Sequence, residues 1–169
     1  MEKKDKEKKL EELLIKLLRK KELSLVTAES CTGGMLTSRL VSVPGASEVL
    51  KAGLVTYSNK AKRKYLDVKK DTLKKYGAVS KQTVKEMAKG AAIGNDSDIA
   101  VSITGIAGPD GGTEEKPVGL VYIGCYAKDH VTIKEYKFKG SRQEIREAAT
   151  QAAMELMYTC VLDNYGKIK

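Results

Sequence analysis

Apolar residues recur along the chain with two different spacings. Residues 5–21 carry leucines at positions i, i+3, i+4, i+7 and i+8, which predicts an amphipathic helix that packs on the domain or on a second subunit. Short runs rich in Val, Ile, Leu and Thr instead predict strands at residues 23–28, 49–57 and 98–104. The leucines of the first helix are Leu10, Leu13, Leu14, Leu17 and Leu18.

Helical segments separate these strands, and a hairpin follows them. Further helices are predicted over residues 35–43, after Ser58-Asn59, and from an N-cap at Ser80 to residue 92. Residues 118–127 and 130–138 predict two strands joined by a tight turn. The last helix begins with a capping box formed by Ser141 and Glu144, and its apolar face continues to Val161.

This order of elements predicts an α/β fold, a three-layer α/β/α sandwich with a mixed, mainly parallel sheet. We expect a single domain over residues 1–169, with a charged, flexible segment at residues 1–9. Trp is absent and Phe138 is the only Phe, so aliphatic residues and Met must build the core.

The charge of the chain narrows the choice of partners. The net charge is +9, and residues 60–75 carry eight basic and two acidic residues. Few aromatic residues lie nearby to stack on bases, so nucleic-acid binding is disfavoured, and a solvated basic face or attraction of a phosphate ligand is favoured. No apolar run approaches the roughly 20 residues of a membrane span, so we expect no membrane association.

The cysteines indicate the compartment. Cys31, Cys125 and Cys160 are widely spaced and form no CxxC pair, which argues against a disulfide framework and against a zinc site. We therefore expect a cytoplasmic protein and no metal.

The first candidate site follows the first strand. Glu29-Ser30-Cys31-Thr32 leads through Gly33-Gly34 into a helix, which places a hydroxyl beside backbone NH groups at a helix start. This arrangement suits a nucleophile together with a bound anion or oxyanion. Alternatively, Ser30 or Thr32 is a simple helix N-cap.

Two further segments are weaker candidates taken alone. Tyr57 can be a packing residue of a strand and Lys62 a solvated helix charge. The glycine-rich residues 104–112 after a core strand are typical of a ligand-binding loop, but also of a tight surface turn.

Taken in order, several segments resemble the signature segments of the CinA C-terminal domain family, and the resemblance covers about residues 8–162. It implies a nicotinamide mononucleotide deamidase, an amidohydrolase without a cofactor that releases ammonia from the carboxamide and leaves nicotinic acid mononucleotide. The matching segments are residues 28–34 (AESCTGG), 56–59 (TYSN) with 61–62 (AK), 77–80 (GAVS), 105–112 (GIAGPDGG) and 116–119 (KPVG).

By this resemblance Ser30 corresponds to the catalytic serine, with Tyr57 and Lys62 as its partners. We expect Ser30 to attack the carboxamide carbon, and Lys62 to take its proton if burial or neighbouring cations lower the lysine pKa towards about 7 to 8. Tyr57 orients the lysine or relays the proton. Whether Ser30 is acylated or positions a water molecule stays open.

The substrate needs partners as well. Backbone NH groups near Thr32 to Gly34 or at Gly105 are expected to hold the oxyanion, and Arg142 is either a substrate contact or an ordinary arginine at a helix start. The expected substrate-binding residues are Thr32, Gly33, Gly34, Thr104, Gly105 and Arg142.

The remaining histidine and cysteine candidates are less suited to catalysis, and two other functions are compatible with the sequence. His130, the only histidine, starts a late strand, which argues against a Ser-His-Asp triad, and Cys31 is interpreted as a packing residue. Two rival functions stay open: a non-catalytic nucleotide-binding or regulatory module linked to competence or DNA damage, and an amidase for another small carboxamide. The apolar stripe of the first helix also predicts a homo-oligomer.

Overall fold

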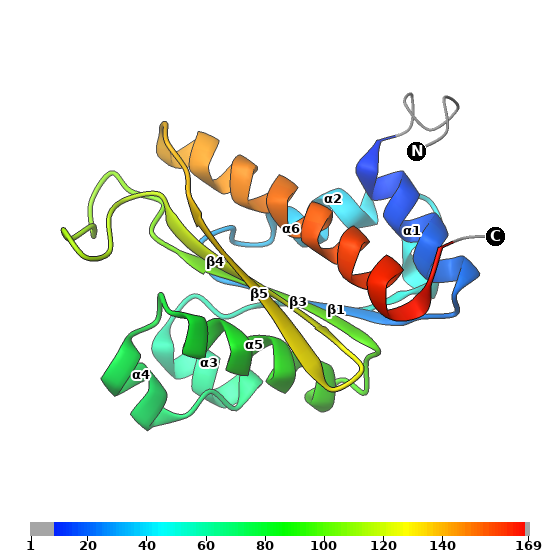
Figure 1. The fold of residues 1–169 in the computed structure, drawn as a ribbon, viewed down its shortest axis with the longest axis horizontal. Coiled ribbons are helices and arrows are strands. Elements are labelled where there is room, and N and C mark those ends of the chain that lie inside the picture. Colours follow the sequence, from blue (N-terminus) through cyan, green and yellow to red (C-terminus); the bar gives the residue numbers. More distant parts are fainter. Residues whose placement is uncertain (1–8, 168–169) are drawn as a thin grey trace.

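The computed structural model describes residues 9–167, in which one five-stranded sheet lies between two layers of helices (Figure 1). Most of the segment predicted to be charged and flexible, residues 1–8, lies outside the described residues. The strands are β1 (Leu25–Glu29), β2 (Leu50–Val55), β3 (Ile99–Gly105), β4 (Leu120–Ala127) and β5 (His130–Lys137). The helices are α1 (Leu10–Lys20), α2 (Met35–Val41), the 3-10 turn η2 (Ala46–Glu48), α3 (Asn59–Leu66), α4 (Lys70–Tyr76), α5 (Lys81–Gly94) and α6 (Arg142–Tyr165).

The sheet has the strand order β2-β1-β3-β4-β5. β1 pairs in parallel with β2 and β3, whereas β4 is antiparallel to both β3 and β5. Four of the five strands therefore run in the same direction, which confirms the predicted mixed, mainly parallel sheet. The hairpin turn at Lys128 and Asp129 has two positive φ angles, 49° and 60°, as a two-residue turn between twisted strands requires.

Each face of the sheet carries its own helical layer and its own core. α1, α2 and α6 cover one face and α3, α4 and α5 the other, so the three-layer α/β/α sandwich is confirmed (Figure 1). Leu14, Leu17 and Leu18 of α1 are fully buried in the first core, where α1 contacts α2 and α6. The leucine stripe thus packs on its own domain, and the predicted homo-oligomer loses the observation on which it rested.

The basic segment, expected to be one helix, is two. Asp67 adopts the left-handed conformation (φ 54°) and ends α3 before α4 begins. The N-caps predicted at Ser80 and Ser141 are confirmed, because each hydroxyl accepts a hydrogen bond from the backbone NH three residues later. Ser58 caps α3 in the same way.

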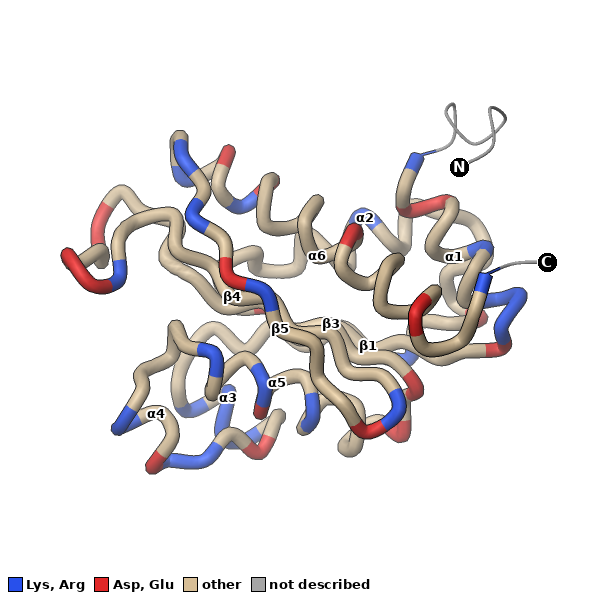
Figure 2. The backbone as a smooth tube through the Cα atoms, viewed as in Figure 1, with Lys and Arg blue, Asp and Glu red and all other residues tan. Residues whose placement is uncertain are grey.

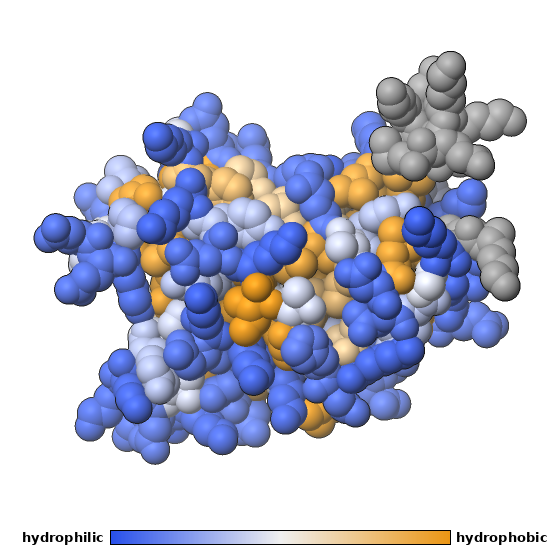
Figure 3. All heavy atoms as spheres, viewed as in Figure 1, coloured by the Kyte–Doolittle hydropathy of each residue, from blue (hydrophilic) through white to orange (hydrophobic). Residues whose placement is uncertain are grey.

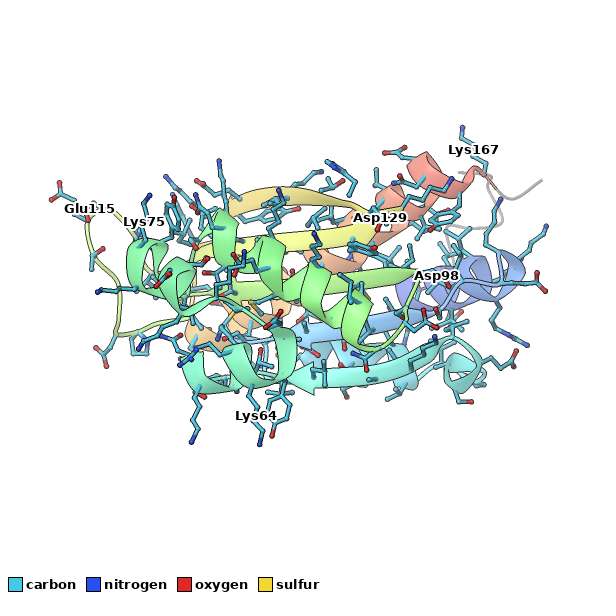
Figure 4. The ribbon with its side chains drawn as sticks, turned by 90° about the horizontal axis from the view of Figure 1, so that it is seen from below. Lys64, Lys75, Asp98, Glu115, Asp129 and Lys167 are labelled. Atoms are coloured by element: carbon cyan, nitrogen blue, oxygen red, sulfur yellow. The ribbon has the colours of Figure 1, made fainter. Side chains whose placement is uncertain are left out.

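Basic residues are frequent on the α3–α5 layer. Lys and Arg mark these helices densely in Figure 2, and the space-filling view in Figure 3 is hydrophilic with small separate apolar patches. Lys64 of α3 points away from the sheet (Figure 4). Of the eight basic residues in the range 60–75, only Lys62 is buried. Within residues 9–167, no helix combines the length and the apolar character that crossing a bilayer demands.

Candidate active site

A cavity of about 270 Å³ opens at the carboxyl ends of β1 and β3, the edge at which α/β sheets bind their ligands. Six of the nine predicted site residues line it, whereas Thr32, Gly33 and Gly34 do not. The predicted residues in its lining are Ser30, Tyr57, Lys62, Thr104, Gly105 and Arg142. They come from α3, β3 and α6 and from the connections that follow β1 and β2.

Lys62 and Ser30 are in direct contact in this cavity. The lysine Nζ donates hydrogen bonds to Ser30 Oγ at 3.0 Å and to the Thr56 carbonyl at 2.8 Å. The serine is fixed by its backbone NH, which donates to the Ile103 carbonyl of β3. Lys62 reaches inward from the first turn of α3, and only 1% of it is exposed. The predicted pair of a nucleophile and a base candidate is therefore assembled.

Burial lowers the pKa of Lys62 from 10.5 to about 8. Of the two expected causes, burial is the one that acts, because the neighbouring cations Lys60, Arg63 and Lys64 are exposed and contribute nothing to the shift. An amine with this pKa has a substantial neutral fraction near pH 8, so it can accept a proton there.

Cys31 also lines the cavity, but its thiol is a poor nucleophile. Burial raises the pKa of Cys31 to about 11. The thiol is therefore protonated at neutral pH, and the hydroxyl of the adjacent Ser30 is the better candidate for attack.

Tyr57 and Arg142 form the rim of the site. Arg142 donates to the Gly108 carbonyl at 2.7 Å and to the Tyr57 hydroxyl at 3.0 Å, so it joins the start of α6 to the glycine-rich loop. Tyr57 is 62% exposed. Within the described residues its hydroxyl is hydrogen-bonded only to Arg142, so the expected contact with Lys62 is not formed in this conformation.

Thr104 and Gly105 form the wall of the cavity at the end of β3. The Thr104 hydroxyl donates to the Ala78 carbonyl at 2.8 Å, which uses its hydrogen and leaves its oxygen as an acceptor. Gly105 is required by close packing, because a Cβ there would lie 2.6 Å from a methyl group of Val121 and 2.9 Å from the Leu120 carbonyl. The glycine thus brings β4 close to the cavity.

The NH groups at the start of α2 were expected to be free for a ligand, but a side chain of the same chain binds them. The Glu29 carboxylate is fully buried and occupies this helix end, where a bound anion was expected. The Gly33 NH donates to the Ser30 carbonyl, so neither glycine offers a free donor. The donors to Glu29 are the NH groups of Gly34 (3.2 Å), Leu36 (2.9 Å) and Thr37 (3.0 Å) and the Thr37 hydroxyl (2.7 Å).

Solved structures share this fold and sequence. A competence/damage inducible protein from Agrobacterium tumefaciens superposes with a TM-score of 0.87 at 42% identity, over 89% of this chain and 92% of that one. A CinA superfamily protein from Escherichia coli gives 0.88 at 33% identity, over 95% and 93% of the two chains. The sequence profile of the CinA C-terminal domain matches residues 7–161. The chain belongs to the CinA C-terminal domain family.

Curated relatives support the same assignment. A protein of Clostridium novyi named as competence-damage inducible is 57% identical over 146 residues, and a CinA-like protein of Kosmotoga olearia is 50% identical over 156 residues. These alignments cover 86% and 92% of this chain but only 35% and 38% of the relatives. The chain therefore spans little more than a third of their length, and their names state no reaction.

Two residues of this CinA domain were missed by the sequence analysis. Glu29 was treated only as part of a motif, and Arg146 was not considered. Arg146 donates to the carbonyls of Cys31 and Thr32, each at 3.0 Å. The signal that identifies it is its spacing, because it lies one helical turn after Arg142 and so shares its face of α6.

The single histidine of this CinA domain lies far from the cavity. His130 starts β5 opposite Ala127, which pairs with the first residue of β3, Ile99, so the histidine lies at the end of the sheet remote from the cavity. Figure 4 places the nearby Asp129 at the opposite end from Glu115 of the loop between β3 and β4. Across residues 9–167, no three His, Cys, Asp or Glu side chains are grouped so that they can hold a metal ion.

Proposed function

We propose that this CinA-family chain is an amidohydrolase that converts nicotinamide mononucleotide into nicotinic acid mononucleotide and ammonia. Ser30 is the nucleophile and Lys62 the general base. The observation that carries the proposal is the 3.0 Å contact between a buried lysine whose pKa is lowered to about 8 and a serine hydroxyl in the cavity.

The reaction proceeds in two halves. Neutral Lys62 takes the proton of Ser30 while the serine oxygen attacks the carboxamide carbon, and the resulting ammonium group protonates the departing nitrogen. The C–N bond breaks, ammonia leaves, and the acyl group stays on Ser30 as an ester. Water then attacks this ester, Lys62 accepts one proton of the water, and this proton returns to the serine oxygen as the carboxylic acid is released. The acid loses its remaining proton to the solvent.

Lys62 is held in position for this task. The carbonyl of Thr56 accepts one of its hydrogens at 2.8 Å, which fixes the direction of the amine. A second hydrogen points at Ser30 in the protonated lysine, and in the neutral amine the lone pair takes its place. The contact between Lys62 Nζ and Ser30 Oγ can therefore carry the proton from the serine to the lysine and back.

The size and charge of the site favour a small anionic carboxamide. The cavity of about 270 Å³ is near the lower end of the range for small-molecule sites, which suits a pyridine carboxamide entering it with the ribose phosphate at the rim. Arg142 and Tyr57 lie at that rim, and the guanidinium offers positive charge to the phosphate. Thr104 is proposed to contact the substrate deeper in the cavity.

Ammonia release tests the proposal. Purified wild type is assayed with nicotinamide mononucleotide, nicotinamide riboside and free nicotinamide, beside Ser30→Ala and the matched control Ser47→Ala, whose serine is exposed and distant in sequence from the cavity residues. We expect activity on the mononucleotide that Ser30→Ala loses and Ser47→Ala keeps. A folded but inactive wild type contradicts the enzyme and favours the regulatory module. Equal activity on the riboside favours an amidase for another carboxamide.

The remaining parts of the proposal concern compartment and assembly. We place the reaction in the cytoplasm, where a reducing environment keeps the three unpaired cysteines as thiols. A homo-oligomer stays a prediction, to be tested by the mass in solution. All residues of the proposed reaction come from a single chain.

A further inference from the structure

The turn between β1 and α2 is held from both sides by charged groups of its own chain. The Glu29 carboxylate accepts the NH groups at the start of α2, so this anion fixes the second half of the turn. Arg146 reaches across from α6 and donates to the carbonyls of Cys31 and Thr32, each at 3.0 Å, which fixes the first half.

This arrangement determines where the remaining NH groups point. In a trans peptide the NH and the carbonyl point in opposite directions. Because Arg146 draws the Cys31 carbonyl towards α6, the NH of Thr32 points away from α6. The Ser30 carbonyl accepts from the Gly33 NH inside the turn, so the NH of Cys31 points out of the turn.

These two NH groups differ from their neighbours in having no partner. Within the part of the chain that the structure describes, neither the Cys31 NH nor the Thr32 NH has an acceptor, whereas the NH groups of Gly33 and Gly34 are both bonded. Cys31 directly follows the proposed nucleophile and lines the cavity, whereas Thr32 does not line it. Free donors beside an attacking oxygen are what a developing oxyanion needs.

We propose that the backbone NH of Cys31 binds the oxyanion that forms when Ser30 attacks the carboxamide, and that Arg146 is the positioning residue that holds this NH. The inference rests on the proposed amidohydrolase function and narrows the donors to one peptide in the turn. Arg146 touches neither substrate nor reacting atoms. It fixes the Thr32 carbonyl, the NH of the same peptide (Gly33) holds the Ser30 carbonyl, and the peptide of Ser30 carries the Cys31 NH.

The guanidinium is suited to this task because its planar fork can bind two carbonyls at once. The Nε of Arg146 donates to the Cys31 carbonyl and its Nη2 donates to the Thr32 carbonyl. A lysine has a single charged nitrogen and a glutamine a single pair of NH hydrogens, so neither reproduces both contacts in the same geometry.

Steady-state kinetics provide the first test. In Arg146→Gln we expect kcat to fall about 10²-fold with KM within about threefold, because oxyanion donors act in the transition state and their loss costs about 10² to 10³ in kcat. The matched control is Arg39→Gln, since Arg39 also ties α6 to a neighbouring helix through Gln151 and Glu11 but does not contact the turn. Guanidinium ion should restore part of the kcat of Arg146→Ala and leave Arg39→Ala unchanged. A kcat within threefold of wild type in Arg146→Gln overturns the role of Arg146.

Amide resonances provide a second test that does not need turnover. Pyridine-3-boronic acid forms a tetrahedral, negatively charged boronate on Ser30, and one hydroxyl oxygen of this boronate stands in for the oxyanion. We expect the NH proton of Cys31 to move downfield more than those of Thr32, Gly33 and Gly34, and this difference to disappear in Arg146→Gln. Equal shifts at all four residues overturn the proposal.

The kinetic test and the amide-resonance test together separate this inference from the proposed function. A wild type that releases no ammonia but shows the selective amide shift contradicts the substrate and keeps the oxyanion donor. Turnover without the selective shift keeps the amidohydrolase and removes this donor. A wild type that shows neither overturns both.

Discussion

Lys62 Nζ lies 3.0 Å from Ser30 Oγ, and both groups are buried at the edge of the sheet where β1 ends. One physical cause has two consequences here. Removal from water lowers the pKa of Lys62 to about 8, which provides a base, and the same removal costs folding free energy whenever the lysine is protonated. Activity and stability should therefore depend on this one residue in opposite ways.

The pH dependence of the reaction should follow Lys62. In the proposed mechanism the neutral amine is the active form, so we expect kcat/KM to rise about tenfold per pH unit below about pH 7 and to level off above the lysine pKa of about 8. Initial rates of ammonia release between pH 6 and 10 measure this. A rate that falls as the pH rises through 8 contradicts the assignment of Lys62 as the base.

Replacing Lys62 by methionine should stabilise the fold while abolishing activity. A pKa shift from 10.5 to about 8 corresponds to a folding cost of about 3 kcal/mol near pH 7, and methionine fills similar space without a charge. The folded protein binds fewer protons than the unfolded chain between about pH 8 and 10.5, so wild-type stability should rise across that window and the variant should lack this slope.

Urea unfolding at pH 7 and pH 10 measures this effect. The matched control is Arg63→Met, since Arg63 is the exposed neighbour of Lys62 on α3, and a surface change there should stay within about 0.5 kcal/mol. If Lys62→Met is less stable than wild type at pH 7, the hydrogen bonds of Lys62 contribute more free energy to folding than the burial of its charge costs.

The features of the fold that depend on short stretches of sequence were predictable. The capping box of Ser141 and Glu144 and the N-cap at Ser80 act over three residues, and both are present. The alternation of strands and helices was likewise enough to predict the layers. The break between α3 and α4 was missed, because a positive φ is uncommon for residues other than glycine. Asp67 belongs to the few residue types enriched there, but a single Asp within a lysine-rich run is a weak signal for a helix end.

The proposed active-site pair, Ser30 and Lys62, was predictable only through the family resemblance. Within α3, Lys62 differs in nothing from its basic neighbours until the strand and helix pack and bring it inward. The roles of Glu29 and Arg146 were not predictable, because helix-start NH groups look free in a sequence until a side chain is seen to bind them. The contact from Arg146 to Cys31 joins positions 115 residues apart.

Tyr57 and Arg142 should act as a unit at the rim. Arg142→Gln and Tyr57→Phe are each expected to lower kcat/KM, and the double variant to lose less than the product of the two effects, by about fivefold or about 1 kcal/mol. The reason is that both single changes break the same 3.0 Å hydrogen bond. Tyr65→Phe is the matched control, since Tyr65 is exposed on α3 and does not line the cavity. Fully additive losses show that the two residues serve the substrate separately.

Glu29→Gln should destabilise the protein strongly although the two side chains have nearly the same shape. The carboxylate accepts hydrogen bonds from three backbone NH groups and one hydroxyl in a fully buried position, and the amide replaces one acceptor oxygen by a donor that faces other donors. Hydrogen bonds to charged groups contribute about 1.5 to 3 kcal/mol each, so we expect a loss of about 2 to 4 kcal/mol in urea unfolding at pH 7.

The exposed Glu48 offers the matched comparison. It forms an ion pair with Arg19 at 2.9 Å on the surface, where removing the charge should cost less than about 1 kcal/mol. Because Glu29 also fixes the turn that follows Ser30, the folded Glu29→Gln protein should in addition lose kcat, whereas Glu48→Gln should keep it. Equal losses of stability in the two variants would mean that solvent reaches the start of α2 and replaces the carboxylate there.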